Sequence, residues 1–575
     1  MAQSSTAAAA AGALYSVLLR ILSFSLSQLT IRFVDPTTLG KASIRLELIC
    51  STTVLFLGRE GFRLSLMRVA DSANDDNKHL KSSRVNNVAW LSVPTSLFLT
   101  LIALGFHMHT YRGQVSAGEK DELDDYRLAG ILYCVATAIE IISEPCMIVC
   151  LRTIDVKTRA KAEAFASIGK AMSCVLLLSF HDRKHHASSF GLAQCVYAII
   201  LTIVLYVEKR GCLEWPVMIG SGPMSLFTKI KTSFDLSVLR LSILFSTQSI
   251  FKHVLTEGDR IVLTALVGTY DSGVYAMASS YGGMASRLIF QPLEENGRLL
   301  FSNQHASIIQ AKEEKREVGQ LVDNLEWTYC VLVKFVLYIG FIFAVFGSNY
   351  TSVLLRLLAG ERWGSNKEAS TALSAFCIYT ALMALNGMTE AFVYGVAESG
   401  LEVGSLAVAH GLIGIVFYVT APLLVYNGSD YGIGGTVGLV MANGLCMALR
   451  SIYSLHFASS HFAKYRNSMK ESNESTRVGK RLPALDFMRK LLPRTPILVV
   501  FIVSYNLMNR SRIWFCNEGR IAHPPLLSTE IASHIGVGIT CFIVTGTLVY
   551  FLEKDFGRSL RAMVSRSSGD KAKVE

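Results

Sequence analysis

The chain has 575 residues, of which 51% are hydrophobic and only 17% charged, with a formal net charge of +11. Soluble globular proteins carry about 25% charged residues, so this composition excludes an ordinary soluble domain and indicates a membrane protein. The basic residues lie in loops beside apolar segments and not along one face of a soluble fold, which argues against nucleic acid as a partner and for contact with membrane lipids.

Apolar segments long enough to cross a bilayer, about 17 to 25 residues each, recur along the chain. They predict an all-α, polytopic membrane protein with about 14 transmembrane helices. The expected spans, in chain order, are 11–34, 45–57, 88–106, 128–151, 165–180, 190–207, 239–255, 261 or 272 to 290, 329–346, 372–396, 405–426, 432–455, 496–508 and 534–551. The second, seventh and thirteenth give the weakest signal.

The loop charges predict the orientation of these spans. Residues 1–11 carry no charged side chain, which favours a retained first helix over a cleaved signal peptide. Lys and Arg concentrate in the loops after even-numbered spans and in the C-terminal tail, so both termini are expected in the cytosol. The tail ends in Lys571-Ala572-Lys573-Val574-Glu575, which resembles a dilysine retrieval signal for the endoplasmic reticulum.

Two stretches of the chain match weakly but in order. Residues 34–40 align with 267–273 with Val and Gly in register, and residues 58–64 align with 293–299 after a slip of two residues. We therefore expect two parallel repeats, the second beginning near Leu239. The expected organisation is an N-terminal bundle (1–210), a cytosolic linker (211–237), a second bundle (238–456), a basic cytosolic loop (457–494), two further spans (495–552) and a cytosolic tail (553–575).

The sequence lacks the usual signatures of catalysis. The twelve cysteines form no C-x-x-C pair, and neither a phosphate-binding loop nor a nucleophile elbow is present. His181, His185 and His186 have a metal-like spacing, but a solvated turn explains them better than a zinc site. The sequence thus predicts movement of a substrate and not an enzyme, and it indicates no metal or cofactor.

Five arginines lie in or beside the first two spans. They are Arg20, Arg32, Arg45, Arg59 and Arg63. The arginine side chain suits a phosphate at low dielectric, because its planar fork donates two parallel hydrogen bonds and keeps its charge. The alternative is that those near span ends simply reach the interface, whereas Arg20 lies in mid-span and favours a cavity.

Charged residues also occur beside the apolar segments in the second half of the chain. Glu257, Asp259 and Arg260 follow the seventh span, and Arg287 and Glu294 lie one helix later. A solvated turn at Gly258 is the simple interpretation of the first group. Three other acids lie in apolar surroundings, and each could be a helix cap, an ion-pair partner of an arginine or a proton relay: Glu140, Glu144 and Glu390.

Taken together, several short sequence motifs in this chain resemble those of the eukaryotic Rft family of endoplasmic reticulum membrane proteins. The resemblance covers nearly the whole length of the chain. The matching motifs are Leu19-Arg20, Ile31-Arg32-Phe33, Leu57-Gly58-Arg59-Glu60-Gly61-Phe62-Arg63, Glu144-Pro145, Val156-Lys157, Leu255-Thr256-Glu257-Gly258-Asp259-Arg260, Arg287-Leu288-Ile289-Phe290-Gln291-Pro292-Leu293-Glu294-Glu295 and Asn386-Gly387-Met388-Thr389-Glu390. The family is associated with translocation of dolichol-diphosphate-linked oligomannose for protein N-glycosylation, so the resemblance implies this lipid-linked oligosaccharide as the partner.

The family is similar to the multidrug, oligosaccharidyl-lipid and polysaccharide flippases, which implies two bundles around a central cavity. By that resemblance Arg20, Arg32 and Arg45 are expected to hold the diphosphate, with Arg59 and Arg63 as further candidates. The other charged residues are expected in a gate or in ion pairs between the bundles. They are Lys157, Glu257, Asp259, Arg260, Arg287, Glu294 and Glu390.

Two rival functions stay open at this stage. A cation-coupled multidrug exporter of the same superfamily should have acidic residues, not basic ones, lining its first bundle. A non-transporting accessory or chaperone factor should tolerate neutral substitution of the cavity arginines.

Overall fold

The computed structural model describes residues 25, 28–67, 78–112, 120–153, 155–182, 185–210, 215–216, 233–314, 316–397, 400–430, 435–472, 487, 489–515 and 528–562. Within these ranges the regular structure is entirely helical. Among the described residues, eight helices are long and apolar enough to cross a membrane, or nine if one bent pair counts as a span. The protein is therefore an all-helical, multi-span membrane protein, and it divides into two compact units, Met1–Ala276 and Met277–Glu575.

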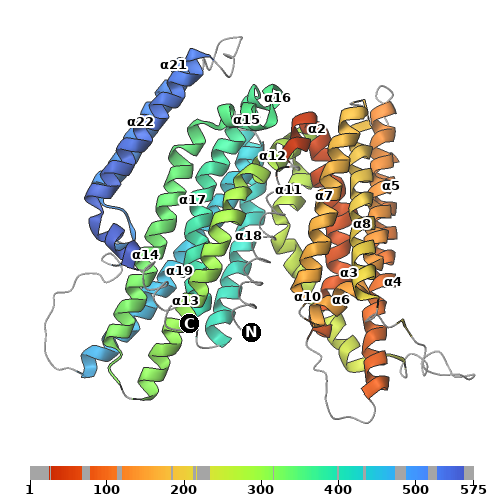
Figure 1. Cartoon of the computed structure of the whole chain (residues 1–575), viewed down its shortest axis with the longest axis horizontal. Helices are drawn as coiled ribbons and strands as arrows, with labels where there is room; N and C mark the ends of the chain where they lie inside the picture. Colours follow the sequence, from red (N-terminus) through yellow and green to blue (C-terminus); the bar gives the residue numbers. More distant parts are fainter. Residues whose placement is uncertain are drawn as a thin grey trace, which may run out of the picture. The chain divides into compact units, whose positions relative to one another are not determined.

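The first unit is a bundle of long helices that run side by side (Figure 1). Its elements are α2 (Pro36–Leu39), η1 (Gly40–Thr52), α3 (Thr53–Leu66), α4 (Lys78–Arg112), α5 (Lys120–Ile142), α6 (Glu144–Arg152), α7 (Val156–Phe180), α8 (His186–Lys209), α10 (Leu236–Thr256), α11 (Gly258–Leu266) and the first part of α12 (Thr269–Ala285).

The second unit holds the rest of α12 and a second set of long helices, with α21 and α22 paired at one edge of this unit (Figure 1). Its elements are η3 (Ser286–Phe290), α13 (Gln291–Glu313), α14 (Gly319–Val345), η4 (Gly347–Asn349), α15 (Thr351–Ala359), α16 (Glu361–Gly364), α17 (Lys367–Val396), α18 (Gly400–Asp430), α19 (Gly435–Ser472), α21 (Thr495–Phe515) and α22 (Thr529–Leu552).

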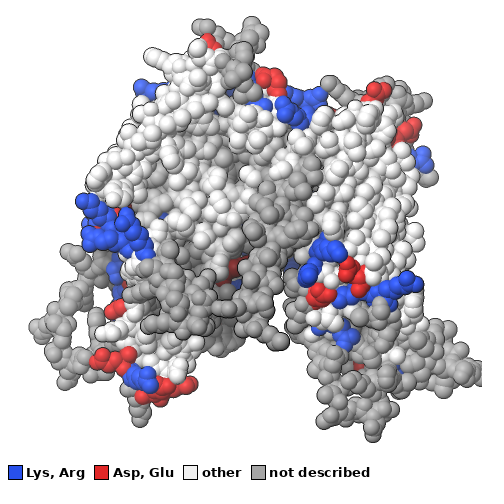
Figure 2. Space-filling model, in the orientation of Figure 1, with Lys and Arg blue, Asp and Glu red and all other residues white. Residues whose placement is uncertain are grey.

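The apolar segments predicted most of these helices. Eight spans have a long apolar helix in the expected place, namely the third, fifth, sixth, ninth to twelfth and fourteenth, and the bent pair α5–α6 corresponds to the fourth. The second, seventh, eighth and thirteenth are helical but fall outside that set. In Figure 2 the helix sides are mostly uncharged, and Lys, Arg, Asp and Glu gather toward the helix ends, as expected of lipid-facing surfaces.

The second predicted span is part of a longer helical stretch than expected. Asp35 caps its start by accepting a hydrogen bond from the amide of Thr38, and Pro36 occupies the first turn. The middle section, η1, is a π-helix in which hydrogen bonds reach back five residues, so the amide of Thr53 donates to the carbonyl of Leu48. Such a section widens the helix and turns its side chains relative to those of α3.

The expected end of the eighth span at Phe290 is wrong, because the helix continues through α13 to Glu313. Proline ends many helices, and Pro292 lies two residues after this position. Here the π-helical turn η3 precedes it, and the amide of Gln291 donates to the carbonyl of Ser286. Pro292 thus falls in the first turn of α13, where its missing amide does least harm.

The predicted basic loop also begins too early. Helix α19 continues to Ser472, well past the expected end of the twelfth span at 455. Ala458 and Phe462 lie four residues apart, so they share one helix face. Both are buried in the core of the second unit, together with Tyr329 and Phe392, and this packing keeps the polar extension helical.

The two turns that align in the sequence, 34–40 and 267–273, are in contact within the first unit. A Cβ atom added to Gly40 would overlap the carbonyl oxygen of Thr269, and one added to Gly273 would overlap that of Pro36. If the two stretches are equivalent, these contacts are reciprocal, as in a two-fold interface. Helix α10 belongs to the first compact unit, so the expected repeat boundary near residue 239 stays a prediction.

Candidate functional site: paired arginines and an acidic pocket

Two arginines of α3 form ion pairs with two buried glutamates of α5 and α6. Arg59 Nη1 lies 2.9 Å from Glu140 Oε1. Arg63 donates from Nε and Nη2 to the two oxygens of Glu144, at 2.5 and 2.7 Å. Glu140 is 5% exposed and Glu144 is 2% exposed. The forked pairing of Arg63 with Glu144 is the strongest geometry for this kind of bond.

The spacing of the four residues explains the arrangement. The two arginines are four residues apart on α3, and the two glutamates are four residues apart across a bend of 44° between α5 and α6. Residues at this spacing share one helix face, so two helices can match pair to pair. Of the three roles left open for Glu140 and Glu144, the structure shows the ion pair. The matched four-residue spacing is the sequence signal for this pairing.

Two glycines in the same motif bring neighbouring helices close to α3. A Cβ atom on Gly58 would lie 3.0 Å from the Cα of Ser96 in α4, and one on Gly61 would lie 2.6 Å from the amide nitrogen of Ser246 in α10. Real Cβ atoms essentially never show a contact of 2.6 Å, and one of 3.0 Å is unusually tight, so glycine permits this packing. The motif therefore fixes α3 against α4 and α10 while its arginines reach α5 and α6.

The remaining arginines of the first unit differ from this pair. Arg20 lies outside the described residues, and Arg32 is exposed at the end of a helical turn. Arg45 is half-buried in η1, where its Nη2 donates to the carbonyl oxygen of Val267 at 3.1 Å. In the described part of the chain Arg45 has no carboxylate partner, and its buried Nε has no hydrogen-bond acceptor. It is thus a half-buried cation whose charge is not neutralised.

The charged turn between α10 and α11 is bound locally within the first unit. Arg260 Nη1 lies 3.3 Å from Glu257 Oε2, one helical turn away. Asp259 accepts a hydrogen bond of 2.5 Å from the hydroxyl of Tyr275 in α12. These contacts hold α11 against α12, so the turn is structurally constrained and not merely solvated.

In the second unit, α13 and α17 enclose an acidic pocket of about 380 Å³. Its lining includes Glu294 and Glu390, and the carboxylate of Glu294 lies directly against the backbone of Gly387. His410 Nε2 lies 3.0 Å from Glu390 Oε1. The motifs 287–295 and 386–390, which resemble those of the Rft family, thus lie side by side in this pocket, although some ninety residues separate them in the sequence.

Two residues expected in a gate lie elsewhere on the surface. Arg287 is exposed, and its Nη2 donates to the carbonyl oxygen of Ser280 at 3.2 Å. Lys157 is exposed in the first turn of α7. Neither has an ion pair within the described ranges. Whether either residue acts in a gate stays a prediction.

Near Lys157, Asp155 joins the start of α7 to the end of α8. Lys209 Nζ lies 2.7 Å from Asp155 Oδ2, and the amide of Thr158 also donates to this carboxylate. These hydrogen bonds, that of Lys209 first, lower the pKa of Asp155 from 3.8 to about 2. Because the pKa is lower in the fold than in the unfolded chain, the carboxylate stabilises the fold above pH 3.8, and that contribution is lost as the pH falls through about 2.

We expect Asp155→Asn to unfold at a lower temperature than the natural protein near neutral pH. The gap should narrow as the pH falls from about 4 to about 2, which thermal unfolding of the purified protein over that range would measure. Asp182→Asn, which removes an exposed carboxylate of the same unit, serves as control. A gap that stays constant with pH would contradict this account of Asp155.

Within the described residues, no cluster of three His, Cys, Asp or Glu side chains is placed to hold a metal ion. The charged side chains of these sites can act through electrostatic attraction. The first unit presents an unneutralised arginine and two buried ion pairs, and the second presents a pocket lined by three carboxylates. Such an arrangement can bind and release a charged group, and it contains no obvious nucleophile with an activating base.

Comparison with solved structures agrees with the helical architecture. The fold is similar to that of the lipid II flippase MurJ in its inward closed conformation, with a TM-score of 0.55 and 10% sequence identity, over 94% of this chain and 98% of that one. At this identity the likeness concerns the fold alone.

Sequence comparisons cover nearly the whole chain. It is 27% identical to the Man(5)GlcNAc(2)-PP-dolichol translocation protein RFT1 of Dictyostelium discoideum, over 94% of both proteins. It is 28% identical to the protein of the same name from Mus musculus, over 96% of both. The profile of the Rft protein family matches residues 4–563. Because that match extends over almost the entire length, the chain belongs to the Rft family.

Proposed function

We propose that this protein translocates a dolichol-diphosphate-linked oligomannose across the endoplasmic reticulum membrane for protein N-glycosylation. The relatives that match over nearly their whole length are named for a Man(5)GlcNAc(2)-PP-dolichol, and we choose the proposed substrate on the basis of those names. We further propose about 14 spans in two pseudo-symmetric bundles around a central cavity, with both termini in the cytosol. The fold likeness to a lipid flippase supports that arrangement.

The single structural observation that supports diphosphate binding is Arg45. It is half-buried, and within the described part of the chain only a backbone carbonyl, that of Val267, accepts a hydrogen bond from its guanidinium. A diphosphate would satisfy the charge and the free Nε together, since an arginine fork matches phosphate oxygens. Arg20 and Arg32 complete the proposed binding set.

For Arg59 and Arg63 we propose an indirect role. Each already has a carboxylate partner, so binding a diphosphate would require that partner to be released. The pairs hold α3, which continues directly from η1, and thereby position Arg45. They also argue against the rival cation-coupled exporter, which should have acidic residues lining its first bundle. The first-unit glutamates Glu140 and Glu144 are instead neutralised by arginines.

In cells that lack the protein, we expect Arg45→Gln to leave glycoproteins underglycosylated although the variant accumulates normally. The reason is loss of a half-buried arginine that has no carboxylate partner within the described residues, so that its charge is available to a substrate. Arg159→Gln is the matched control, since Arg159 pairs with Glu163 at the exposed surface of α7 in the same unit. Full glycosylation with Arg45→Gln would favour the accessory-factor alternative instead.

A further inference from the structure

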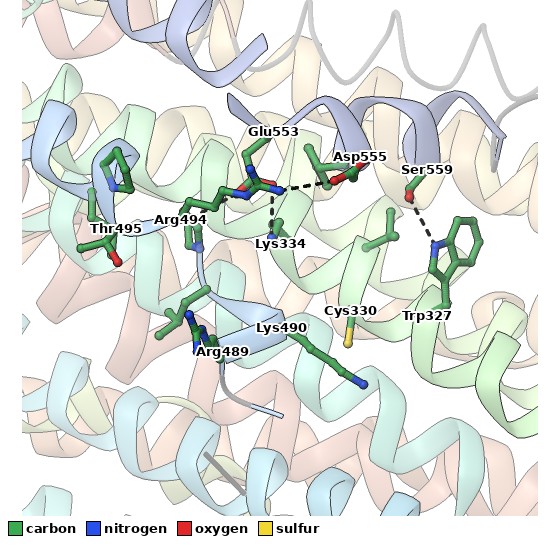
Figure 3. A pocket seen from close by; sticks show the side chains of 16 residues that line it. Trp327, Cys330, Lys334, Arg489, Lys490, Arg494, Thr495, Glu553, Asp555 and Ser559 are labelled. Atoms are coloured by element: carbon green, nitrogen blue, oxygen red, sulfur yellow. Dashed lines mark hydrogen bonds and ion pairs between the residues drawn. The ribbon is translucent and has the colours of Figure 1, made fainter. Parts of the chain in front are cut away.

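A cavity of about 910 Å³ opens in the second unit where the α21–α22 pair meets α14. Three segments line it: one face of α14, the segment that leads into α21, and the helical segment 554–562 with the turn at Glu553 before it (Figure 3). Trp327 of α14 donates a hydrogen bond to Ser559 across it at 3.3 Å. A cavity of this size matches those that hold drug-sized ligands.

The lining of this cavity is rich in cations. Four basic side chains and two acidic ones, Glu553 and Asp555, lie in the lining (Figure 3). The basic set is Lys334, Arg489, Lys490 and Arg494. The cavity therefore has a surplus of positive charge and fits an anion.

Three of the four cations have a carboxylate partner, and that of Lys490 is the buried Glu326, 2.7 Å away and outside the lining, so the unpaired positive charge among the described residues of the lining is that of Arg489. Lys334 lies 3.4 Å from Glu553, and Arg494 lies 3.3 Å from Asp555. The second pair joins two exposed side chains, at 54% and 73%, and such pairs contribute little and exchange readily. Arg489 is exposed and has no ion pair within the part of the chain that the structure describes.

A second hollow of about 390 Å³ adjoins the turn after α22 and shares Glu553 and Phe556 with the first. Its lining adds three more cations, Lys554, Arg558 and Arg561. Figure 2 shows Lys and Arg gathered in one patch over this end of α22. The positive charge thus continues from the cavity onto the surface around it.

The surroundings of the cavity favour a lipid over a soluble anion. Beside it, α21 and α22 carry large apolar side chains that are half or more exposed: Ile502, Val503, Leu507, Ile539, Phe542 and Ile543. Such faces are typical of contact with acyl chains, and aromatic residues such as Trp327 and Phe556 mark the boundary between acyl chains and headgroups. A molecule with a charged head and apolar tails would satisfy both features.

We propose that this cavity binds the phosphate-bearing headgroup of an anionic membrane lipid, whose tails lie along α21 and α22. Basic pockets between transmembrane helices are known to take such headgroups. The site lies within the second unit and does not depend on the proposed translocation. The bound headgroup would hold the α21–α22 pair against α14 by bridging Arg489 and Arg494 with the cations beside α22.

The test is native mass spectrometry of the full-length protein with dioleoyl phosphatidylinositol as the probe and dioleoyl phosphatidylcholine as the neutral reference. We expect the natural protein to retain phosphatidylinositol preferentially. Arg489→Gln/Arg494→Gln should retain it at least about tenfold less well, since each cation contributes about a fivefold factor. Arg489→Lys, which keeps the charge, should bind nearly as well as the natural protein.

The control is Lys312→Gln/Arg316→Gln, which removes two exposed charges of the second unit outside the cavity. Equal loss of phosphatidylinositol in this control and in the Arg489/Arg494 variant would overturn the proposal. So would tight binding of inorganic diphosphate without any preference for phosphatidylinositol, because the ligand would then be a soluble anion. Arg489→Gln alone leaves every ion pair in place, so a loss of binding there would not reflect misfolding.

Discussion

Replacing Arg63 with Met is expected to lower the free energy of unfolding by about 3–5 kcal/mol. The substitution removes the forked partner of Glu144, which is only 2% exposed, and leaves it only the more distant Arg59, whose Nη1 lies 3.9 Å from Glu144 Oε2. Removing one member of a buried pair is costly because the other charge remains away from water. Chemical or thermal unfolding of the purified variant in detergent would measure the change.

The matched comparison is Arg159→Met. Arg159 and Glu163 form a pair four residues apart whose side chains are 44% and 42% exposed, so its loss should change stability by only about 0.3–0.5 kcal/mol. The double variant Arg63→Met/Glu144→Leu should recover much of the loss, because no charge is left buried. If Arg63→Met proved as mild as Arg159→Met, the buried pairs would not hold α3 in place.

Gly273→Ala is expected to destabilise the protein by about 1–3 kcal/mol or more, and Gly40→Ala by a similar amount. In each case the added methyl group would overlap a backbone carbonyl oxygen, of Pro36 or of Thr269, which cannot rotate away as a side chain could. The two helix starts would have to separate. Unfolding experiments and the yield of folded protein would report this effect.

Gly268→Ala provides the control for these two variants. Gly268 lies in the same segment, but an added Cβ atom there would meet no atom within 4 Å. We expect it to behave like the natural protein. Equal tolerance of alanine at positions 268 and 273 would show that the close contact between the aligned turns does not matter for the fold.

The sequence predicted the long helices well because the bilayer imposes a simple length and polarity rule. Helices such as α8 and α14 correspond to long, strongly apolar segments of the sequence. The rule failed where helices carry polar residues for reasons of packing. Neither the passage of α13 through Pro292 nor the extension of α19 beyond 455 follows from local composition, because η3 and the buried Phe462 support them.

The candidate site was predicted only in part. The sequence singles out Arg59, Arg63 and Glu144 as charged residues in apolar surroundings, but it does not specify which helices become neighbours. The pairing therefore had to come from the fold, although the shared four-residue spacing was available. The convergence of Glu294 and Glu390 in one pocket depends on α13 packing against α17, which no local pattern encodes.

The basic cavity beside α21 was not anticipated. Its residues come from three segments, and three of its four cations, Arg489, Lys490 and Arg494, lie in the predicted basic loop. Lys334 and Glu553 are typical, since each looks unremarkable in its own helix and gains meaning from lying 3.4 Å from the other. Long-range proximity is the information that the sequence lacks.

The most direct test of the central claim is transport by purified protein in sealed vesicles that contain dolichol-diphosphate-linked oligomannose. We predict that vesicles with the natural protein move this lipid between leaflets faster than empty vesicles, and that Arg45→Gln reduces the rate while Arg159→Gln does not. Movement no faster than in empty vesicles, with Arg45→Gln indistinguishable from the natural protein, would contradict the account.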